Sequence, residues 1–134
     1  MSQKKFVLDA YPFLVFLKKQ KNWEKISDLF SKGIKNELNI MITVVNLGEV
    51  YYSVLKDAGT ETAETVIESV NYLSISIVDT NWELAKQAAI YKSKGGISYA
   101  DCFAASLAKR EKAILITGDK EFLQLKNEIE ILWI

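Results

Sequence analysis

Residues 97–119 are the most informative part of the chain, and they read Ile-Ser-Tyr-Ala-Asp-Cys-Phe-Ala-Ala-Ser-Leu-Ala-Lys-Arg-Glu-Lys-Ala-Ile-Leu-Ile-Thr-Gly-Asp. Ser98 and Asp101 resemble a capping box at the start of a helix that runs to about Lys109. The apolar run 113–116 follows after a short gap and is typical of a buried strand. A helix that leads directly into a buried strand is the repeating unit of parallel α/β sheets, so this stretch predicts that class of fold.

The rest of the chain repeats this alternation of strands and helices. Short apolar runs predict strands at 6–8, 39–43, 74–78, 113–116 and 130–133. Helical spacing predicts helices at 12–19, 22–35, 45–56, 60–72, from 80 to the glycines at 95 and 96, 98–109 and 120–125. We expect Asn22, Thr60 and Thr80 to cap three of these helices, and Gly59 to end one of them. The sequence thus predicts one three-layer α/β domain over residues 1–134, with a mainly parallel sheet.

Composition restricts the class of partner only weakly. The 134 residues carry 17 acidic and 17 basic side chains, so no net basic charge indicates nonspecific binding of long nucleic acids. A local basic rim can still accompany an acidic centre, and lysines 18, 19, 21, 92, 94, 109 and 120 are candidates, although most solvated lysines have no such role. The single cysteine, Cys102, fits a reducing compartment, so we expect a cytoplasmic protein. The apolar run 6–17 contains Asp9 and Pro12 and is too short to span a bilayer, so we expect no membrane attachment.

The chain contains no histidine. This excludes imidazole general bases, Ser-His-Asp triads and zinc sites with histidine ligands. A metal site in this chain must therefore use oxygen ligands, which favour hard cations such as Mg²⁺ or Mn²⁺.

Four acidic residues stand in unusually apolar surroundings. Asp9, Glu49 and Asp101 are each the only charge in an apolar stretch of about a dozen residues, and Asp119 directly follows the strand predicted at 113–116. Burying an ionised carboxylate without a partner costs several kcal/mol. Apart from Lys5, no lysine or arginine lies within four residues of Asp9, Glu49 or Asp101. A divalent cation is therefore the simplest partner for these carboxylates.

The predicted topology brings the same four residues together. Asp9 and Asp119 follow two strands, while Glu49 and Asp101 lie on helices, and ligands of open α/β sheets bind beyond the carboxyl ends of the strands. Asn46 lies on the same helix face as Glu49 and is expected to support it. Each acid taken alone has another reading, as a turn or capping residue, and Asp79 is assigned only that role. The hypothesis depends on all four acids together.

Four motifs then indicate a family. Residues 7–10 (Val-Leu-Asp-Ala), 46–50 (Asn-Leu-Gly-Glu-Val), 97–105 and 115–122 (Leu-Ile-Thr-Gly-Asp-Lys-Glu-Phe) resemble the successive motifs of PIN-domain nucleases. The size resembles VapC-type toxins of prokaryotic toxin–antitoxin pairs. The resemblance implies a five-stranded sheet in the order 3-2-1-4-5 and Mg²⁺- or Mn²⁺-dependent cleavage of RNA.

The resemblance also assigns roles to residues. It maps the family's acidic positions onto Asp9, Glu49, Asp101 and Asp119, with Glu121 as a further candidate ligand on a longer side chain. Thr117 corresponds to a positioning hydroxyl. We interpret Asp9, Asp101 and Asp119 as metal ligands, with Glu49 binding the metal or orienting an attacking water.

The resemblance further implies an antitoxin and a homodimer as partners. Aromatic side chains of the helices are expected to be mostly core, with some forming a groove for an antitoxin segment: Tyr11, Phe13, Phe16, Trp23, Tyr51 and Tyr52.

Three alternatives remain. The first is a housekeeping PIN nuclease of RNA processing, and the second is an inactive PIN-fold binding module. The third is a phosphatase or phosphoryl acceptor that uses Asp9 as nucleophile. Haloacid-dehalogenase-like phosphatases need an Asp-x-Asp pair, but position 11 is tyrosine. A receiver domain needs an early pair of acids, which is also missing.

Overall fold

The computed structural model describes residues 3–134 and contains one five-stranded sheet, whose strands run in the order β3-β2-β1-β4-β5. All four neighbouring pairs are parallel, which confirms the expected α/β fold and strand order. The strands are β1 (Lys4–Leu8), β2 (Leu38–Thr43), β3 (Ile75–Val78), β4 (Ile114–Thr117) and β5 (Glu130–Trp133).

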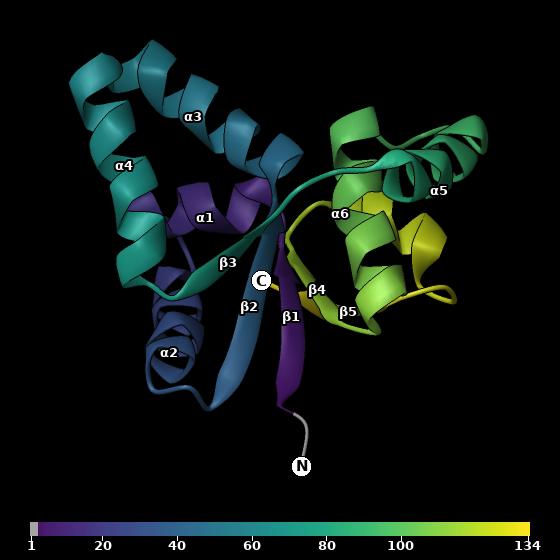
Figure 1. The fold of residues 1–134 in the computed structure, drawn as a ribbon, viewed down its shortest axis with the longest axis horizontal. Coiled ribbons are helices and arrows are strands. Elements are labelled where there is room, and N and C mark those ends of the chain that lie inside the picture. The colour runs from purple at the N-terminus through teal and green to yellow at the C-terminus, as the bar shows by residue number, and fades with distance from the viewer. Residues whose placement is uncertain (1–2) are drawn as a thin grey trace.

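Helices cover both faces of the sheet and make three layers (Figure 1). The helices are α1 (Ala10–Leu17), α2 (Trp23–Ile34), α3 (Val44–Ala58), α4 (Thr60–Tyr72), α5 (Trp82–Ser93) and α6 (Tyr99–Glu111), followed by the 3₁₀ helix η1 (Lys120–Leu125). Helices α1 to α4 lie on one side of the sheet, and α5 and α6 lie on the other (Figure 1). Within residues 3–134, no helix combines the length and the apolar character needed to cross a membrane.

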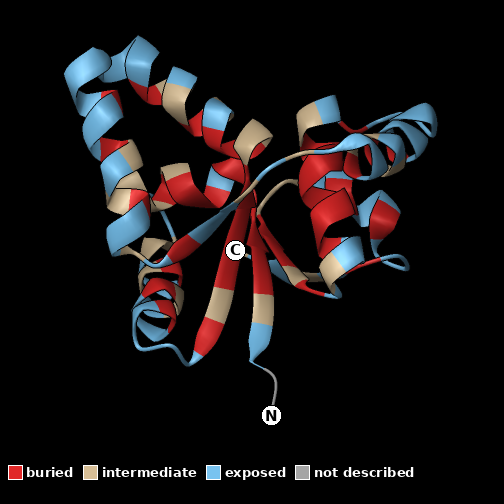
Figure 2. Ribbon diagram, in the orientation of Figure 1, coloured by how far each residue is buried: buried red, intermediate tan, exposed pale blue. Residues whose placement is uncertain are grey.

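The central strands alternate between two hydrophobic cores. In β1, Phe6 and Leu8 pack with the α1–α4 layer, whereas Val7 packs with the α5–α6 layer. In β4, Ile116 and Leu115 divide in the same way, because successive side chains of a strand point to opposite faces. The buried colour in Figure 2 accordingly runs along the middle of the sheet and the inward faces of the helices. The central strands are thus held firmly from both sides, and their carboxyl ends form a fixed platform.

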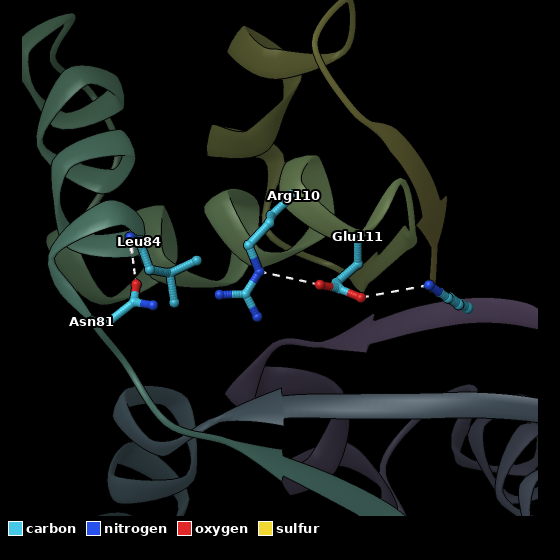
Figure 3. Close-up of polar contacts among 5 residues, drawn as sticks. Asn81, Leu84, Arg110 and Glu111 are labelled. Atoms are coloured by element: carbon cyan, nitrogen blue, oxygen red, sulfur yellow. Dashed lines mark hydrogen bonds and ion pairs between the residues drawn. The ribbon is translucent and has the colours of Figure 1, made fainter.

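Two helix caps differ from the sequence-based expectation. Asn22 does take the predicted N-cap position of α2, with a left-handed backbone (φ 75°) and without a capping hydrogen bond from its side chain. Gly59, which ends α3 as predicted, also takes the N-cap position of α4, so Thr60 is the first helical residue and not the cap. Asn81, not Thr80, caps α5, and its side chain accepts a hydrogen bond from Leu84 N (2.9 Å; Figure 3). The positions fail because asparagine, threonine and glycine are all acceptable caps, and the loop geometry chooses between neighbours.

Helix α6 is fixed at both ends. At its start, the Ser98 side chain accepts a hydrogen bond from Asp101 N (3.2 Å), as the predicted capping box requires. At its end, the Glu111 carboxylate contacts Arg110 Nε (3.1 Å; Figure 3) and Lys5 Nζ of β1 (3.5 Å). Exposed ion pairs contribute little stability, so α6 is held against β1 mainly by its buried side, where Cys102, Phe103 and Leu107 share one core with Val7. Asp101 therefore has a defined place beside the carboxyl end of the sheet.

Candidate active site

The site forms where the two central strands end. Strands β1 and β4 are direct neighbours, with Leu8 opposite Ile116. Asp9 directly follows β1, and its backbone N–H donates to the Ile116 carbonyl oxygen (3.3 Å). Asp119 follows β4 by two residues, while the second turn of α3 brings Glu49 and the first turn of α6 brings Asp101 to the same edge. The fold thus places all four predicted acids at one end of the sheet.

Five carboxylates form two overlapping groups there. The inner triad consists of Asp9, Glu49 and Asp101, each of which offers one oxygen within 4.8 Å of the others. The outer triad consists of Asp101, Asp119 and Glu121 and meets the same distance criterion. Asp101 belongs to both triads and is their common member. The longer Glu121 side chain therefore does reach the cluster, which its length had left in doubt.

Thr117 connects two of the acids. Its hydroxyl donates a hydrogen bond to Asp9 Oδ2 (3.0 Å) and accepts one from Asp119 N (3.1 Å). The second Asp9 oxygen, Oδ1, accepts from Ala10 N (2.8 Å), and Asp119 Oδ1 accepts from Glu121 N (2.9 Å). Asp9 is thus held in a single orientation, as expected for a group with a positioning hydroxyl beside it.

Asn46 connects α3 to α6. Its side-chain amide donates to Glu49 Oε1 (3.2 Å) and to the Ala100 carbonyl oxygen (3.1 Å). Its Oδ1 accepts a hydrogen bond from the Thr43 hydroxyl, and Asn46 is itself completely buried. The amide therefore orients Glu49 and fixes the distance between the two helices that carry Glu49 and Asp101. This is the supporting place that its spacing predicted.

Burial makes the inner triad electrostatically unfavourable. Burial raises the pKa of Asp9 to about 6, although hydrogen bonds from Thr117 and Ala10 act in the opposite direction. Burial and then the nearby charge of Asp9 raise the pKa of Asp101 to about 8, and burial also raises the pKa of Glu49. Within residues 3–134, none of the ion pairs involves Asp9, Glu49, Asp101 or Asp119.

The donor set fits a hard divalent cation. All candidate ligands are carboxylate oxygens, and lysine or arginine does not neutralise them within the described chain. A cation in either triad would stabilise the ionised carboxylates and so counter the burial that raises these pKa values. The geometry thus fits a divalent cation that prefers oxygen ligands.

Comparison with known proteins agrees with this geometry. A family model of the PIN domain matches residues 6–128. The chain belongs to the PIN domain family. No protein of curated function matches the sequence.

The PIN fold is also seen in solved structures. A chain of the VapBC2 complex of Rickettsia felis bound to a promoter DNA fragment superimposes with a TM-score of 0.74 at 20% identity, covering 97% of this chain and 98% of that one. A chain of DNA-bound VapBC from Salmonella typhimurium gives 0.72 at 18% identity, with coverages of 97% and 98%. VapC20 of Mycobacterium tuberculosis, described as a sarcin–ricin loop cleaving toxin, gives 0.67 at 11% identity, with coverages of 82% and 86%. At these identities the likeness establishes the shared fold.

The carboxylates of this PIN domain open into a cavity of about 400 Å³. Its lining combines carboxylates with other polar, aromatic and apolar side chains, and it comprises Asp9, Ala10, Tyr11, Leu14, Glu49, Tyr52, Ser53, Ser98, Asp101, Asp119 and Glu121. The expectation that the helical aromatics are mostly core holds for Phe13, Phe16, Trp23 and Tyr51, which are buried or half-buried. Tyr11 and Tyr52 are the exceptions, with exposed fractions of 48% and 61%.

The two tyrosines are site residues that the sequence interpretation missed. The available signal was their spacing, because Tyr11 follows Asp9 by two residues and Tyr52 follows Glu49 by three on the same helix. Spacing of three places two side chains on one helix face, which identifies Tyr52 as a neighbour of Glu49.

Among the described residues no lysine lines this cavity, although Lys120 lies in the chain between the lining residues Asp119 and Glu121. Lys18 pairs with Asp57, and Lys109 pairs with Glu128. The Lys92 ammonium donates to the Ile97 carbonyl oxygen, and Lys19 lies over the Trp23 ring. For these four, the structure favours structural or solvated roles.

Proposed function

We propose that this PIN domain, acting over residues 1–134 as one domain, is a Mg²⁺- or Mn²⁺-dependent endoribonuclease of the cytoplasm. The observation that carries the proposal is the pair of carboxylate triads that share Asp101 at the carboxyl ends of β1 and β4. Such a cluster has a large negative charge that bound divalent cations would neutralise, and cations of this type activate phosphodiesters.

The residues divide between binding and proton transfer. Asp9, Asp101 and Asp119 would hold the cation, and Glu49 and Glu121 complete the inner and outer triads. A divalent cation bound here would lower the pKa of the attacking water and would neutralise the charge that develops on the scissile phosphate. Thr117 fixes Asp9 and Asp119 in the orientations that this binding requires.

Glu49 is the candidate general base. It is half-buried, Asn46 orients it, and burial raises its pKa. A raised pKa makes its carboxylate a better acceptor for the proton of the attacking water. The water oxygen forms a bond to phosphorus while the bond to the leaving ribose oxygen breaks. That oxygen takes a proton from solvent, so the products are a phosphate monoester and a hydroxyl end.

We further propose that the protein is the toxin of a type II toxin–antitoxin pair, with a cognate antitoxin and a second copy of itself as partners. The support is the fold shared with chains of VapBC complexes, and with VapC20, which cleaves the sarcin–ricin loop. A housekeeping PIN nuclease is the alternative with the same site chemistry. An inactive binding module is disfavoured, because all four predicted acids converge on one cavity.

The test compares the wild-type protein with Asp9→Asn. In MgCl₂ or MnCl₂ the wild type should cleave RNA, and the variant should fold but not cleave, because it loses a buried ligand with little change in shape. The control is Asp79→Asn, since Asp79 is exposed and outside the cavity, so its cleavage rate should be unchanged. Undiminished cleavage by Asp9→Asn would contradict the mechanism.

Expression in a bacterial host separates the two biological roles. Wild-type expression should arrest growth, with new RNA ends that Asp9→Asn does not produce. Cleavage without growth arrest would favour the housekeeping role. A small gene directly upstream, whose product restores growth, would identify the antitoxin.

A further inference from the structure

The Tyr11 ring has an unusual position in the cavity. Tyr11 is the second residue of α1, it is 48% exposed, and it lines the cavity beside Asp9 and Asp119. A Cβ atom added at Gly118 would lie 2.6 Å from Tyr11 Cε2 and 3.1 Å from Cδ2. The ring therefore rests on the backbone between Thr117 and Asp119, two residues of the carboxylate network.

Gly118 is best explained by this ring. Its φ lies outside the left-handed region, so the backbone conformation does not require glycine. The remaining near contact of the added Cβ is the Ile134 carbonyl oxygen at 3.3 Å, which is longer than both ring contacts. A side chain at position 118 would displace the ring from its seat. Glycine at this position thus gives the exposed tyrosine a fixed orientation.

The neighbouring aromatics of α1 behave differently. Phe13 and Phe16 turn into the core, where both pack against Phe30. Tyr11 instead leaves about half of its surface in water while it is held in place. Tyr52 of α3, which is 61% exposed, and Leu14 line the same cavity. The cavity is therefore lined by exposed aromatic rings as well as by the carboxylates.

The two kinds of side chain in this lining, carboxylates and exposed aromatic rings, suit the two parts of a nucleotide. The carboxylates, with a bound cation, suit a phosphate, and an exposed aromatic ring suits the face of a base. A base in a duplex already stacks on its neighbours, so only an unpaired base offers its face to a protein ring. We propose that Tyr11 is a substrate-positioning residue. Its ring, seated on Gly118, stacks on an unpaired RNA base next to the scissile phosphate. Tyr52 lines the same cavity. This proposal rests on the proposed ribonuclease function.

The test measures stacking separately from cleavage. The probe is a short single-stranded RNA that carries 2-aminopurine, whose fluorescence falls on stacking, titrated in CaCl₂ in place of MgCl₂ to slow hydrolysis. The wild type and Tyr11→Phe should bind and quench the probe equally. Tyr11→Leu should raise Kd by about 10-fold and remove most of the quenching, because stacking on a single base contributes this much.

Two further variants control for damage to the fold. Tyr72→Leu removes an 81% exposed tyrosine at the end of α4, outside the cavity, and should bind like the wild type. Gly118→Ala keeps Tyr11 but displaces its ring, and should also weaken quenching while circular dichroism stays unchanged. If Tyr11→Leu fails to fold, Gly118→Ala alone decides, because undiminished quenching in it would overturn the proposal.

The outcomes for Tyr11 and for the nuclease function are distinguishable. Equal affinity and quenching for Tyr11→Leu and the wild type would overturn the stacking role, and would assign the exposed ring to a protein partner. In MgCl₂, Tyr11→Leu should raise KM for RNA with a much smaller change in kcat. Loss of cleavage in the wild type, with Tyr11-dependent quenching intact, would contradict the nuclease function but not the base contact.

Discussion

The inner and outer triads share Asp101 but differ in how the protein holds them. In the inner triad, Asp9 is 2% exposed and is held by Thr117 of β4, and Glu49 is held by Asn46 of its own helix. In the outer triad, Glu121 is exposed, and Asp119 is held by backbone N–H groups of its own turn and by Thr117. The inner triad is thus rigid and costly to leave without a cation, whereas the outer one adapts. This difference suits one resident cation and a second that enters with the phosphate.

The largest effect should come from Asp101→Asn, because this change removes a ligand from both triads at once. Cleavage should fall on the order of 10³-fold, since the loss of cation binding removes several kcal/mol of transition-state stabilisation. The measurement is kcat/KM on one RNA in MnCl₂, with Asp79→Asn as the matched control. A loss below 10-fold would mean that the triads do not depend on their shared member.

A pair of identical substitutions compares the triads directly. Glu49→Gln and Glu121→Gln each remove one charge without changing shape, one in the buried triad and one in the exposed triad. Glu49→Gln should lower kcat by roughly 10²-fold, as expected for a lost general base. Glu121→Gln should lower it by only a few-fold, and mainly at low metal concentration. Equal losses in the two variants would break the distinction between rigid and adaptable halves.

Metal-free protein should lose stability as the pH rises. The folded pKa values of about 6 for Asp9 and about 8 for Asp101 lie above the usual value of 3.8. The folded state therefore holds protons that the unfolded state releases, so stability is complete below about pH 4 and falls through about pH 6 and about pH 8. Asp9 alone accounts for about 3 kcal/mol of this decrease in the free energy of unfolding.

Urea denaturation at several pH values measures this decrease, with EDTA in one series and MnCl₂ in the other. MnCl₂ should flatten the curve, because a bound cation stabilises the ionised carboxylates. Asp101→Asn should flatten the EDTA curve in part, since it also removes a charge that faces Asp9. A free energy of unfolding that rises with pH in EDTA would show that the inner triad is not strained by its charges.

The smallest effect on stability and metal binding is expected from loss of the Thr117 hydroxyl, which links Asp9 of the inner triad to Asp119 of the outer triad. Thr117→Val keeps the shape of the side chain but removes the hydroxyl that links Asp9 to Asp119 N. Stability and the binding free energy of Mn²⁺ should each fall by about 1 kcal/mol, a typical contribution of one hydrogen bond. Thr117→Ser should retain most of both quantities. Calorimetric titration of Mn²⁺ into the two variants makes the comparison, and equal affinities would remove Thr117 from the site.

The sequence predicted the fold and the central carboxylates for a physical reason. Asp9, Glu49 and Asp101 are isolated charges in apolar segments, and a buried charge needs a compensating partner, which few kinds of site supply. Parallel topology then placed them at one edge without knowledge of side-chain geometry. Asn46 and Thr117 were also within reach, because helix spacing and the motif place them beside an acid.

Other features depend on geometry that the sequence does not encode locally. The reach of Glu121 depends on the tight turn of η1, and the exposure of Tyr11 depends on the contact with Gly118, more than 100 residues away in the chain. The caps at Thr60 and Thr80 were assigned wrongly because each has a neighbour of similar capping ability. These errors do not reach the site, since the caps concerned lie outside the cavity lining.

The hydrogen bond from Asn46 to the Ala100 carbonyl oxygen connects α3 in one helix layer to α6 in the other. Among the described hydrogen bonds of the site, it is the one that joins these two helices. Glu49 comes from the layer of α1 to α4, and Asp101 comes from the layer of α5 and α6, each with its own core. Local opening of either layer would therefore separate the inner triad. Hydrogen exchange should accordingly slow in α3 and α6 together when a cation binds, so that the two layers open as one unit.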